Sequence, residues 1–142
     1  MRKYVLLSLS IIWTFVILSF SVQSGETSGS LSYQITLNVY YFLKNLFINL
    51  DVDTLHLVIR KCAHIGEYAI LGILYSLTAR QFHIKTVIII FCGLAVAFID
   101  EGIQLLSINR GPSIIDTLLF DFPGFLLGFY MMLFIHKKIY KI

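Results

Sequence analysis

The sequence has few charged residues, two cysteines and two prolines. Charged residues make up 13% of its 142 positions and hydrophobic residues 58%, whereas soluble domains average about 25% charged. A disordered chain needs low hydrophobicity and high charge, so this composition excludes one. It also argues against a soluble globule, because a domain of this size could not bury so much apolar surface. The mean hydropathy of +0.84 is typical of a membrane protein.

The small number of cysteines and the lack of a cluster of basic residues exclude several classes of function. Cys62 and Cys92 lie 30 residues apart at different expected depths, which argues against a disulfide, and the sequence has no ligand spacing for structural zinc. The net charge is only +3, and the basic residues stand in small groups between apolar runs. We therefore expect no nucleic-acid partner, and we interpret the basic groups as signals of membrane topology.

Four apolar runs are each long enough to cross a membrane as a helix, which takes about 20 residues. They cover residues 4–22, 62–79, 86–106 and 117–135. The first run is longer than the core of a signal peptide and no Ala-x-Ala cleavage site follows it, so we expect an uncleaved anchor. No repeat or low-complexity tract divides the chain. The sequence thus predicts an all-α integral membrane bundle of four transmembrane helices, with residues 1–142 as a single domain.

Lysine and arginine are distributed unevenly about these runs. Seven of the eleven basic residues fall on the side that would hold both termini of a four-span chain. They are Arg2, Lys3, Arg80, Lys85, Lys137, Lys138 and Lys141. The positive-inside rule places that side in the cytoplasm, and all eight acidic residues lie toward the other side. We predict a multi-pass cell-membrane protein with both termini cytoplasmic.

The segment between the first two runs, residues 23–59, would then lie outside the cell. Residues 24–30 are small or polar, which is typical of a linker, and apolar residues recur every three or four positions over 31–50. This spacing indicates an additional amphipathic helix. It fits a helix on the outer leaflet or one folded over the outer mouth of the bundle. Asp51 and Asp53 are candidate N-caps for the helix that follows.

The first polar group interrupts the run 62–79 near its start. It comprises Arg60, Lys61, His64, Glu67 and Tyr68. Spacings of four and three place Arg60, His64 and Glu67 on one helical face. An ionisable residue at the centre of a membrane helix costs about 2.5–3.5 kcal/mol on insertion scales, so such residues usually mark a site. Lys61 has the alternative of extending to the lipid headgroups.

Asp100, Glu101 and Gln104 form a second polar group, in the run 86–106. Glu67 and Asp100 lie about 20 and 22 Å from the loop that joins their helices, at about 1.5 Å per residue, so antiparallel helices would hold both at one depth. We predict that these carboxylates line one polar cavity with His64, open only to the outside. A polar pair that merely bridges two helices is the structural alternative.

A third group surrounds the Gly-Pro turn that precedes the last run. Arg110 is a natural counter-ion for Asp116 or for an anionic ligand, because guanidinium binds carboxylate and phosphate through two bonds. Farther along, Gly124 and Gly128 form a GxxxG face that favours close helix packing. Asp116 lies on the same helical stripe as both glycines, so we expect its side chain to point inward.

In this order, the polar residues resemble those of the VanZ-like family of small bacterial membrane proteins. The resembling residues are Gln23-Ser24, Arg60-Lys61-x-x-His64-x-x-Glu67-Tyr68, Asp100-Glu101-x-x-Gln104, and Arg110-x5-Asp116 with Gly124 and Gly128. The resemblance implies a multi-pass helical protein that lowers susceptibility to teicoplanin, a lipid-tailed glycopeptide acting on cell-wall precursors outside the membrane. One departure is that Asp121 and Gly124 stand one residue farther from Asp116 than the resemblance implies. This departure predicts a bulge at the start of the last helix.

Two classes of function are open to this site. The first is a binding or shielding module for an anionic membrane lipid, a cell-wall precursor or a lipid-tailed glycopeptide. Its site residues would be Arg60, Lys61, His64, Glu67, Tyr68, Asp100, Glu101, Gln104, Arg110 and Asp116. The alternative is an intramembrane enzyme that modifies an envelope lipid or precursor. Its candidate acid–base groups are His64, Glu67, Asp100 and Glu101. These four residues could hold a divalent metal, but one histidine makes a poor zinc site, so we expect no metal and no cofactor.

Overall fold

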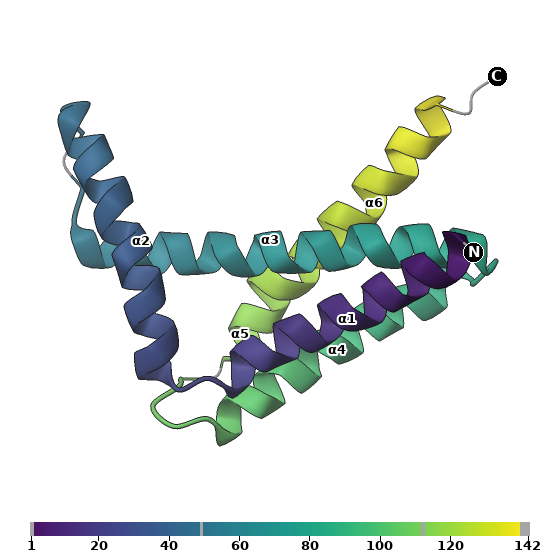
Figure 1. Ribbon diagram of the computed structural model, residues 1–142, viewed down its shortest axis with the longest axis horizontal. Coiled ribbons are helices and arrows are strands. Elements are labelled where there is room, and N and C mark those ends of the chain that lie inside the picture. Colours follow the sequence, from purple (N-terminus) through teal and green to yellow (C-terminus); the bar gives the residue numbers. More distant parts are fainter. Residues whose placement is uncertain (1, 49, 112, 140–142) are drawn as a thin grey trace.

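The computed structural model is all-helical over the residues that it describes, 2–48, 50–111 and 113–139. Pro112 of the predicted turn and Lys141 of the predicted basic end lie outside the described residues. The helices are α1 (Arg2–Val22), α2 (Gly25–Asn45), α3 (Val52–Gln81), α4 (Thr86–Leu106), α5 (Ile114–Asp116), the π-helix η1 (Thr117–Asp121) and α6 (Phe122–Ile139). The long α3 runs through the molecule, α1 and α4 lie side by side, and α6 crosses α3 (Figure 1).

Three segments of the described chain are long and apolar enough to cross a membrane. They are Lys3–Val22, Thr86–Leu106 and Ile114–Lys138, and they correspond to the first, third and fourth predicted runs. The second predicted run, 62–79, lies inside α3 and is not among them. The polar residues of α3 lower its apolar content, so the structure supports three of the four predicted spans.

The helix between the first two runs differs in its boundaries from the prediction. It begins at Gly25, so that residues 25–30, expected to form a linker, make its first turns. Ser24 starts the helix as N-cap, because its hydroxyl accepts a hydrogen bond from the backbone N–H of Thr27 at 3.2 Å. The helix ends at Asn45, earlier than the apolar stripe suggested. Phe47 then takes a left-handed backbone conformation, with φ of 61°.

The start of α3 is set by Asp51, one of the two predicted N-caps. Its carboxylate accepts hydrogen bonds from the backbone N–H and the hydroxyl of Thr54, at 2.9 and 2.8 Å. These bonds hold the pKa of Asp51 below its ordinary value. Because the cap lies so early, α3 has 30 residues and a length of about 45 Å. The N-terminal part of α3 therefore extends well beyond the start of the apolar run at residue 62.

Small residues allow α3 and α6 to pack closely. A Cβ on Gly124 would lie 2.7 Å from the carbonyl oxygen of Ile65, and one on Gly128 would overlap the backbone of Ala69. This contact confirms the GxxxG face predicted from the sequence. Gly72 of α3 meets the backbone of α6 in the same way. The two helices are thus fixed along a seam that no larger residue could occupy.

Aromatic side chains complete the core between α3, α4 and α6. Phe125 and Phe129 are buried, with stacked rings whose centroids lie 6.1 Å apart. Gly93 of α4 lies against the ring of Phe125, so this small residue permits a close approach between α4 and α6. Cys62 and Cys92 are free and exposed, as their separation predicted. The core fixes the helices that carry the polar residues.

Candidate functional site

A cavity of about 280 Å³ lies beside α3 near the C-terminal ends of α1 and α4. The structure brings His64, Glu67 and Asp100 together on its wall, as the sequence predicted. Arg60 and Arg110 line the same cavity. Its remaining wall consists of hydroxyl, amide and apolar side chains from α1, the turn that follows α1, α2 and α3. These are Phe20, Ser21, Gln23, Ser28, Leu31, Ser32, Ile35, Ile59 and Ala63.

A second cavity, of about 290 Å³, adjoins the first. Four further predicted site residues lie on its wall. They are Lys61, Glu101, Gln104 and Asp116. Arg60, His64 and Arg110 line both cavities. Tyr68, by contrast, is fully buried and lines neither. It belongs to the core beneath the site, so its predicted contact with a ligand has no support in the geometry.

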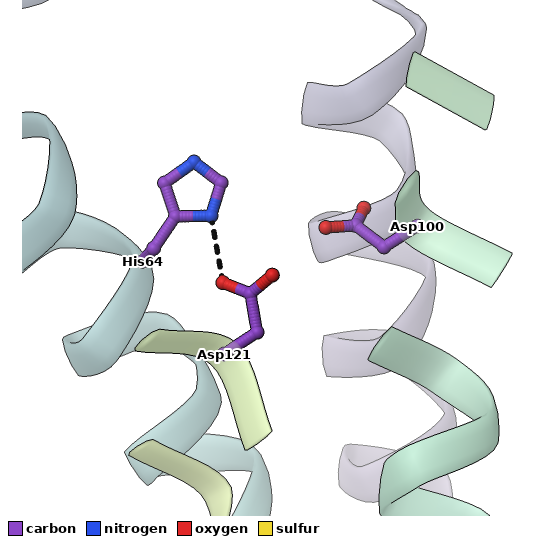
Figure 2. Close-up of side chains that lie close together, drawn as sticks. All are labelled: His64, Asp100 and Asp121. Atoms are coloured by element: carbon purple, nitrogen blue, oxygen red, sulfur yellow. Dashed lines mark hydrogen bonds and ion pairs between the residues drawn. The ribbon is translucent and has the colours of Figure 1, made fainter. Parts of the chain in front are cut away.

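The imidazole of His64 is bonded to Asp121, and not to the carboxylates that share its predicted face. The Nδ1 atom of His64 lies 2.9 Å from the Oδ1 atom of Asp121 (Figure 2). Asp121 is 0% exposed, and its Oδ2 atom has no hydrogen-bond partner within the described chain. In Figure 2 the carboxylates of Asp121 and Asp100 point toward each other. The closest acidic partner of His64 is therefore a residue absent from the predicted site.

Asp121 reaches this position through the π-helix η1. This single turn carries one residue more than an α-helix would, and its wider ring closes with the N–H of Phe122 on the carbonyl of Thr117. Such bulges occur frequently at functional sites. The bulge predicted from the position of Asp121 is therefore present. Sequence reasoning missed Asp121 itself, although its one-residue displacement from the family pattern was a signal that could have found it.

Asp100 is held in place by neighbours on two helices. The hydroxyl of Ser21 on α1 donates to its Oδ1 atom, and the side-chain amide of Gln104 donates to its Oδ2 atom at 3.4 Å. The bond from Gln104 follows from their spacing of four residues on α4. Asp100 is 1% exposed. Ligand atoms of His64, Asp100 and Asp121 all lie within 4.8 Å of one another, so these three residues could hold a cation.

Asp116 forms its ion pair with Lys61. Of the two predicted partners of Arg110, Asp116 is therefore wrong, and the anionic ligand stays a prediction. The ammonium group of Lys61 also lies 4.9 Å from the centroid of the Phe120 ring, a favourable cation–π contact. Lys61 thus belongs to the second cavity, and the alternative of a lysine that only extends to the headgroups does not hold.

Glu101 connects α4 to the loop that precedes α5. Its Oε1 atom accepts a hydrogen bond from the backbone N–H of Ser113, and the residue is buried. The carboxylate fixes the loop that carries Arg110. Glu101 therefore has a structural role that its neighbour Asp100 does not share.

Arg110 joins this loop to α1 and α2. One terminal nitrogen donates to the carbonyl of Phe20 at 2.7 Å and the other to the hydroxyl of Ser28 at 3.5 Å. Its Nε–H is buried and has no partner among the described residues. Burial, and then the positive charge of Arg60, lower the pKa of Arg110. The charge of Arg60 thus disfavours the Arg110 guanidinium, whereas the nearby carboxylates of Asp100, Glu101 and Glu67 favour it. An anion between the two arginines would reduce their mutual repulsion.

These features define a small helical membrane protein with two adjoining cavities, lined by polar and apolar side chains, among its helices. The chain belongs to the VanZ/LLP1 family, whose model matches residues 6–136. The resemblance found in the order of the polar residues is thereby confirmed. No curated protein and no solved structure matches the chain.

Proposed function

We propose that the first cavity binds the anionic, phosphate-bearing headgroup of an envelope lipid or a lipid-linked cell-wall precursor. The observation that carries this proposal is the pair Arg60 and Arg110. Both line both cavities, and neither forms an ion pair with a carboxylate in the described chain. Partly buried cations without counter-ions are costly, and guanidinium binds phosphate through two parallel hydrogen bonds. A bound phosphate would meet both needs.

The apolar part of the wall supports an amphiphilic ligand. Leu31 and Ile35 of α2 face the cavity, and each remains 56% exposed. They would contact the first carbons of an acyl or prenyl chain while the headgroup lies between the arginines. The volume of about 280 Å³ is at the lower limit of pockets for drug-sized ligands, which start at about 300 Å³. It suits a headgroup and is too small for a whole glycopeptide.

This size suggests how the protein would lower susceptibility to lipid-tailed glycopeptides such as teicoplanin. It would shield the lipid or precursor on which they act, and it would not need to bind the antibiotic. A shielding role requires that the cavity face the outside of the cell.

The charge distribution supports that orientation. The start of α1 and the end of α6 lie on the same side of the molecule (Figure 1). The described basic residues at that end are Lys3, Arg80, Lys85, Lys137 and Lys138. By the positive-inside rule this end, with both termini, is cytoplasmic. A reporter enzyme fused to the C-terminus should be active only inside the cell, and activity only outside would contradict the orientation.

A binding measurement tests the proposed ligand class. The purified full-length protein in detergent is titrated with dihexanoyl phosphatidic acid and with dihexanoyl glycerol, which lacks the phosphate. We expect saturable binding of the phosphatidic acid alone. Arg110→Ala should weaken that binding at least about tenfold, or about 1.4 kcal/mol, whereas Arg80→Ala, at the opposite end, should not. Equal binding of both lipids would contradict the proposal.

A second candidate function is acid–base catalysis on the bound headgroup. It is favoured by one observation, the bond between buried Asp121 and Nδ1 of His64. This bond orients the ring and leaves Nε2 to exchange a proton with a ligand. Release of inorganic phosphate from the phosphatidic acid, abolished by His64→Gln, would support this alternative. Saturable binding without release would favour the binding module.

A further inference from the structure

We infer that His64, Asp100 and Asp121 form a binding site for one divalent transition-metal ion, such as Mn²⁺ or Zn²⁺. The three residues come from α3, α4 and η1, and their ligand atoms lie within 4.8 Å of one another (Figure 2). An ion central to three atoms that lie 4.8 Å apart would be about 2.8 Å from each, so inward shifts of about 0.7 Å would give the usual metal–ligand distance of about 2.1 Å. The three elements are fixed by the glycine seam and the aromatic core, which places the ligands without large rearrangement.

The charge balance at this point favours a cation. Asp100 and Asp121 are 1% and 0% exposed, and within the described chain the only ion pair to either is that between His64 and Asp121. Lys61 is already paired with Asp116. Two buried carboxylates facing each other cannot both stay ionised without a positive partner. A metal ion would supply two charges where the imidazole supplies at most one.

A buried carboxylate oxygen of Asp121 without a hydrogen-bond donor also supports a cation between the three residues. The Oδ2 atom of Asp121 is buried and has no hydrogen-bond partner among the described residues, and Figure 2 shows this carboxylate directed toward Asp100. Buried carboxylate oxygens are normally satisfied by a donor or a cation. A metal ion between the carboxylates and the imidazole would bind this oxygen.

The surroundings of Asp100 resemble those of a metal ligand. Ser21 donates to one carboxylate oxygen and Gln104 to the other. Outer hydrogen bonds of this kind orient metal-binding carboxylates and are a regular part of metal sites. The neutral hydroxyl and amide add no positive charge, so they orient Asp100 without neutralising it.

The donor set determines the class of ion. Mg²⁺ and Ca²⁺ prefer oxygen ligands throughout, whereas an imidazole with carboxylates suits first-row transition ions. From the sequence we expected no metal, because the candidate ligands comprised one histidine and did not include Asp121. His64 and Asp100 also line the first cavity, so an open coordination position would meet the bound phosphate. Only this last step rests on the proposed function.

Metal binding is measured without lipid substrate. Full-length protein in detergent is treated with EDTA, freed of chelator, and titrated calorimetrically with MnCl₂, ZnCl₂ and MgCl₂, and bound metal is counted by elemental analysis. We expect one Mn²⁺ or Zn²⁺ per chain and weaker binding of Mg²⁺. Loss of an outer partner costs about 10–100-fold in metal affinity, so Ser21→Ala should weaken binding at least about tenfold and Asp121→Asn more than about 100-fold. Asp53→Asn, an exposed aspartate on α3, is the matched control and should bind as the wild type does.

Two results would overturn the inference. One is that the wild type shows no saturable metal binding, and the other is that the wild type and Asp121→Asn bind the metal with equal affinity. If Asp121→Asn fails to accumulate, His64→Gln provides the same test, because the His64 side chain is 23% exposed and its replacement perturbs the core less. Titration of the EDTA-treated protein with phosphatidic acid separates the two proposals. Lipid binding without metal binding would overturn this inference alone, and metal binding without lipid binding would overturn the proposed function alone.

Discussion

The two ends of the helical bundle contain polar residues of opposite kinds. At the end where α1 starts, basic residues such as Lys85 and Lys137 are exposed. At the end near α2, Asp100 and Asp121 are almost completely buried. Exposed basic residues at the end of an apolar helix are explained by membrane topology alone. Buried carboxylates are not, so the difference points to the second end as the functional one.

Helix packing provides a second contrast between the ends. Ser10 of α1 and Thr78 of α3 form a buried hydrogen bond of 2.8 Å, and Thr14 bonds Tyr75 at 3.1 Å. Neutral hydroxyl groups are therefore sufficient to join helices in this protein. Ser21, on the same helix as Ser10, instead donates to the carboxylate of Asp100. A carboxylate is therefore not required to join helices in this protein, and the buried charge of Asp100 calls for a reason beyond packing.

The largest effect is expected where a substitution disrupts both ends at once. Gly72→Ala would place a Cβ against the backbone of Phe125 and Phe129, and forced overpacking costs about 1–3 kcal/mol or more. We expect little folded protein in the membrane and a lower thermal midpoint. Gly66→Ala on the same helix meets no atom within 4 Å and should be neutral or stabilising by up to about 1 kcal/mol. Equal behaviour of both variants would contradict the seam between α3 and α6.

The next effect separates the arginines of the two ends. Arg110→Ala should abolish any glycopeptide-tolerance phenotype at normal protein level, whereas Arg80→Ala should retain it. Arg110→Lys then tests the geometry of recognition: loss of protection with lysine would imply binding through two hydrogen bonds, and retention would imply a positive field alone. Drug susceptibility measured beside membrane blots decides this. A low level of the Arg110→Ala protein with unchanged protection per molecule would assign Arg110 to loop structure.

A smaller effect is expected when Ser10 and Ser21, two serines of α1 with different partners, are each replaced by alanine. Ser10→Ala removes a neutral bond between helices, which is worth about 0.6 kcal/mol on average in membrane proteins, and should leave ligand binding unchanged. Ser21→Ala removes a bond to a carboxylate, worth about 1.5–3 kcal/mol, and should also weaken ligand binding. Thermal unfolding and phosphatidic acid titration of both variants provide the comparison. If Ser21→Ala binds as tightly as Ser10→Ala, Asp100 is not oriented by Ser21.

The smallest effect concerns an exposed carboxylate near the functional end. Asp51→Ala should fray the first turn of α3, because Asp51 caps it. The pKa of Asp51 lies below the ordinary 3.8, so its stabilising effect is complete above that pH and disappears as the pH falls through the lowered pKa. Circular dichroism melts should therefore differ between wild type and variant at pH 7, and the difference should shrink as the pH falls below 3.8. A difference that persists in acid would mean that the charge is not what caps the helix.

Much of the fold could be predicted because long apolar runs determine it. The predicted run 86–106 has the bounds of α4, and the GxxxG face packs where expected. Helix starts were less predictable, since they depend on single capping hydrogen bonds. Ser24 converts a polar segment into the first turns of α2, and Asp51 extends α3 beyond its apolar part.

The residues of the site were easier to predict than their partners. Helical spacing placed Arg60, His64 and Glu67 on one face, and all three line the cavity. The bonding partners of these residues depend on how separate helices pack together. The spacing of residues within one helix gives no information about that packing. Asp121 joins His64 only because a π-helix turns it inward.

The central claim is that the charge of buried Asp100 serves function and not packing. Asp100→Asn keeps the shape and an oxygen that can accept from Ser21, and removes only the charge. The deciding measurement is teicoplanin susceptibility of cells carrying this variant, divided by its membrane level from quantitative blots. We predict a normal level of protein, since removal of a buried charge is often neutral or stabilising, and loss of protection. A normal level with full protection would contradict the claim.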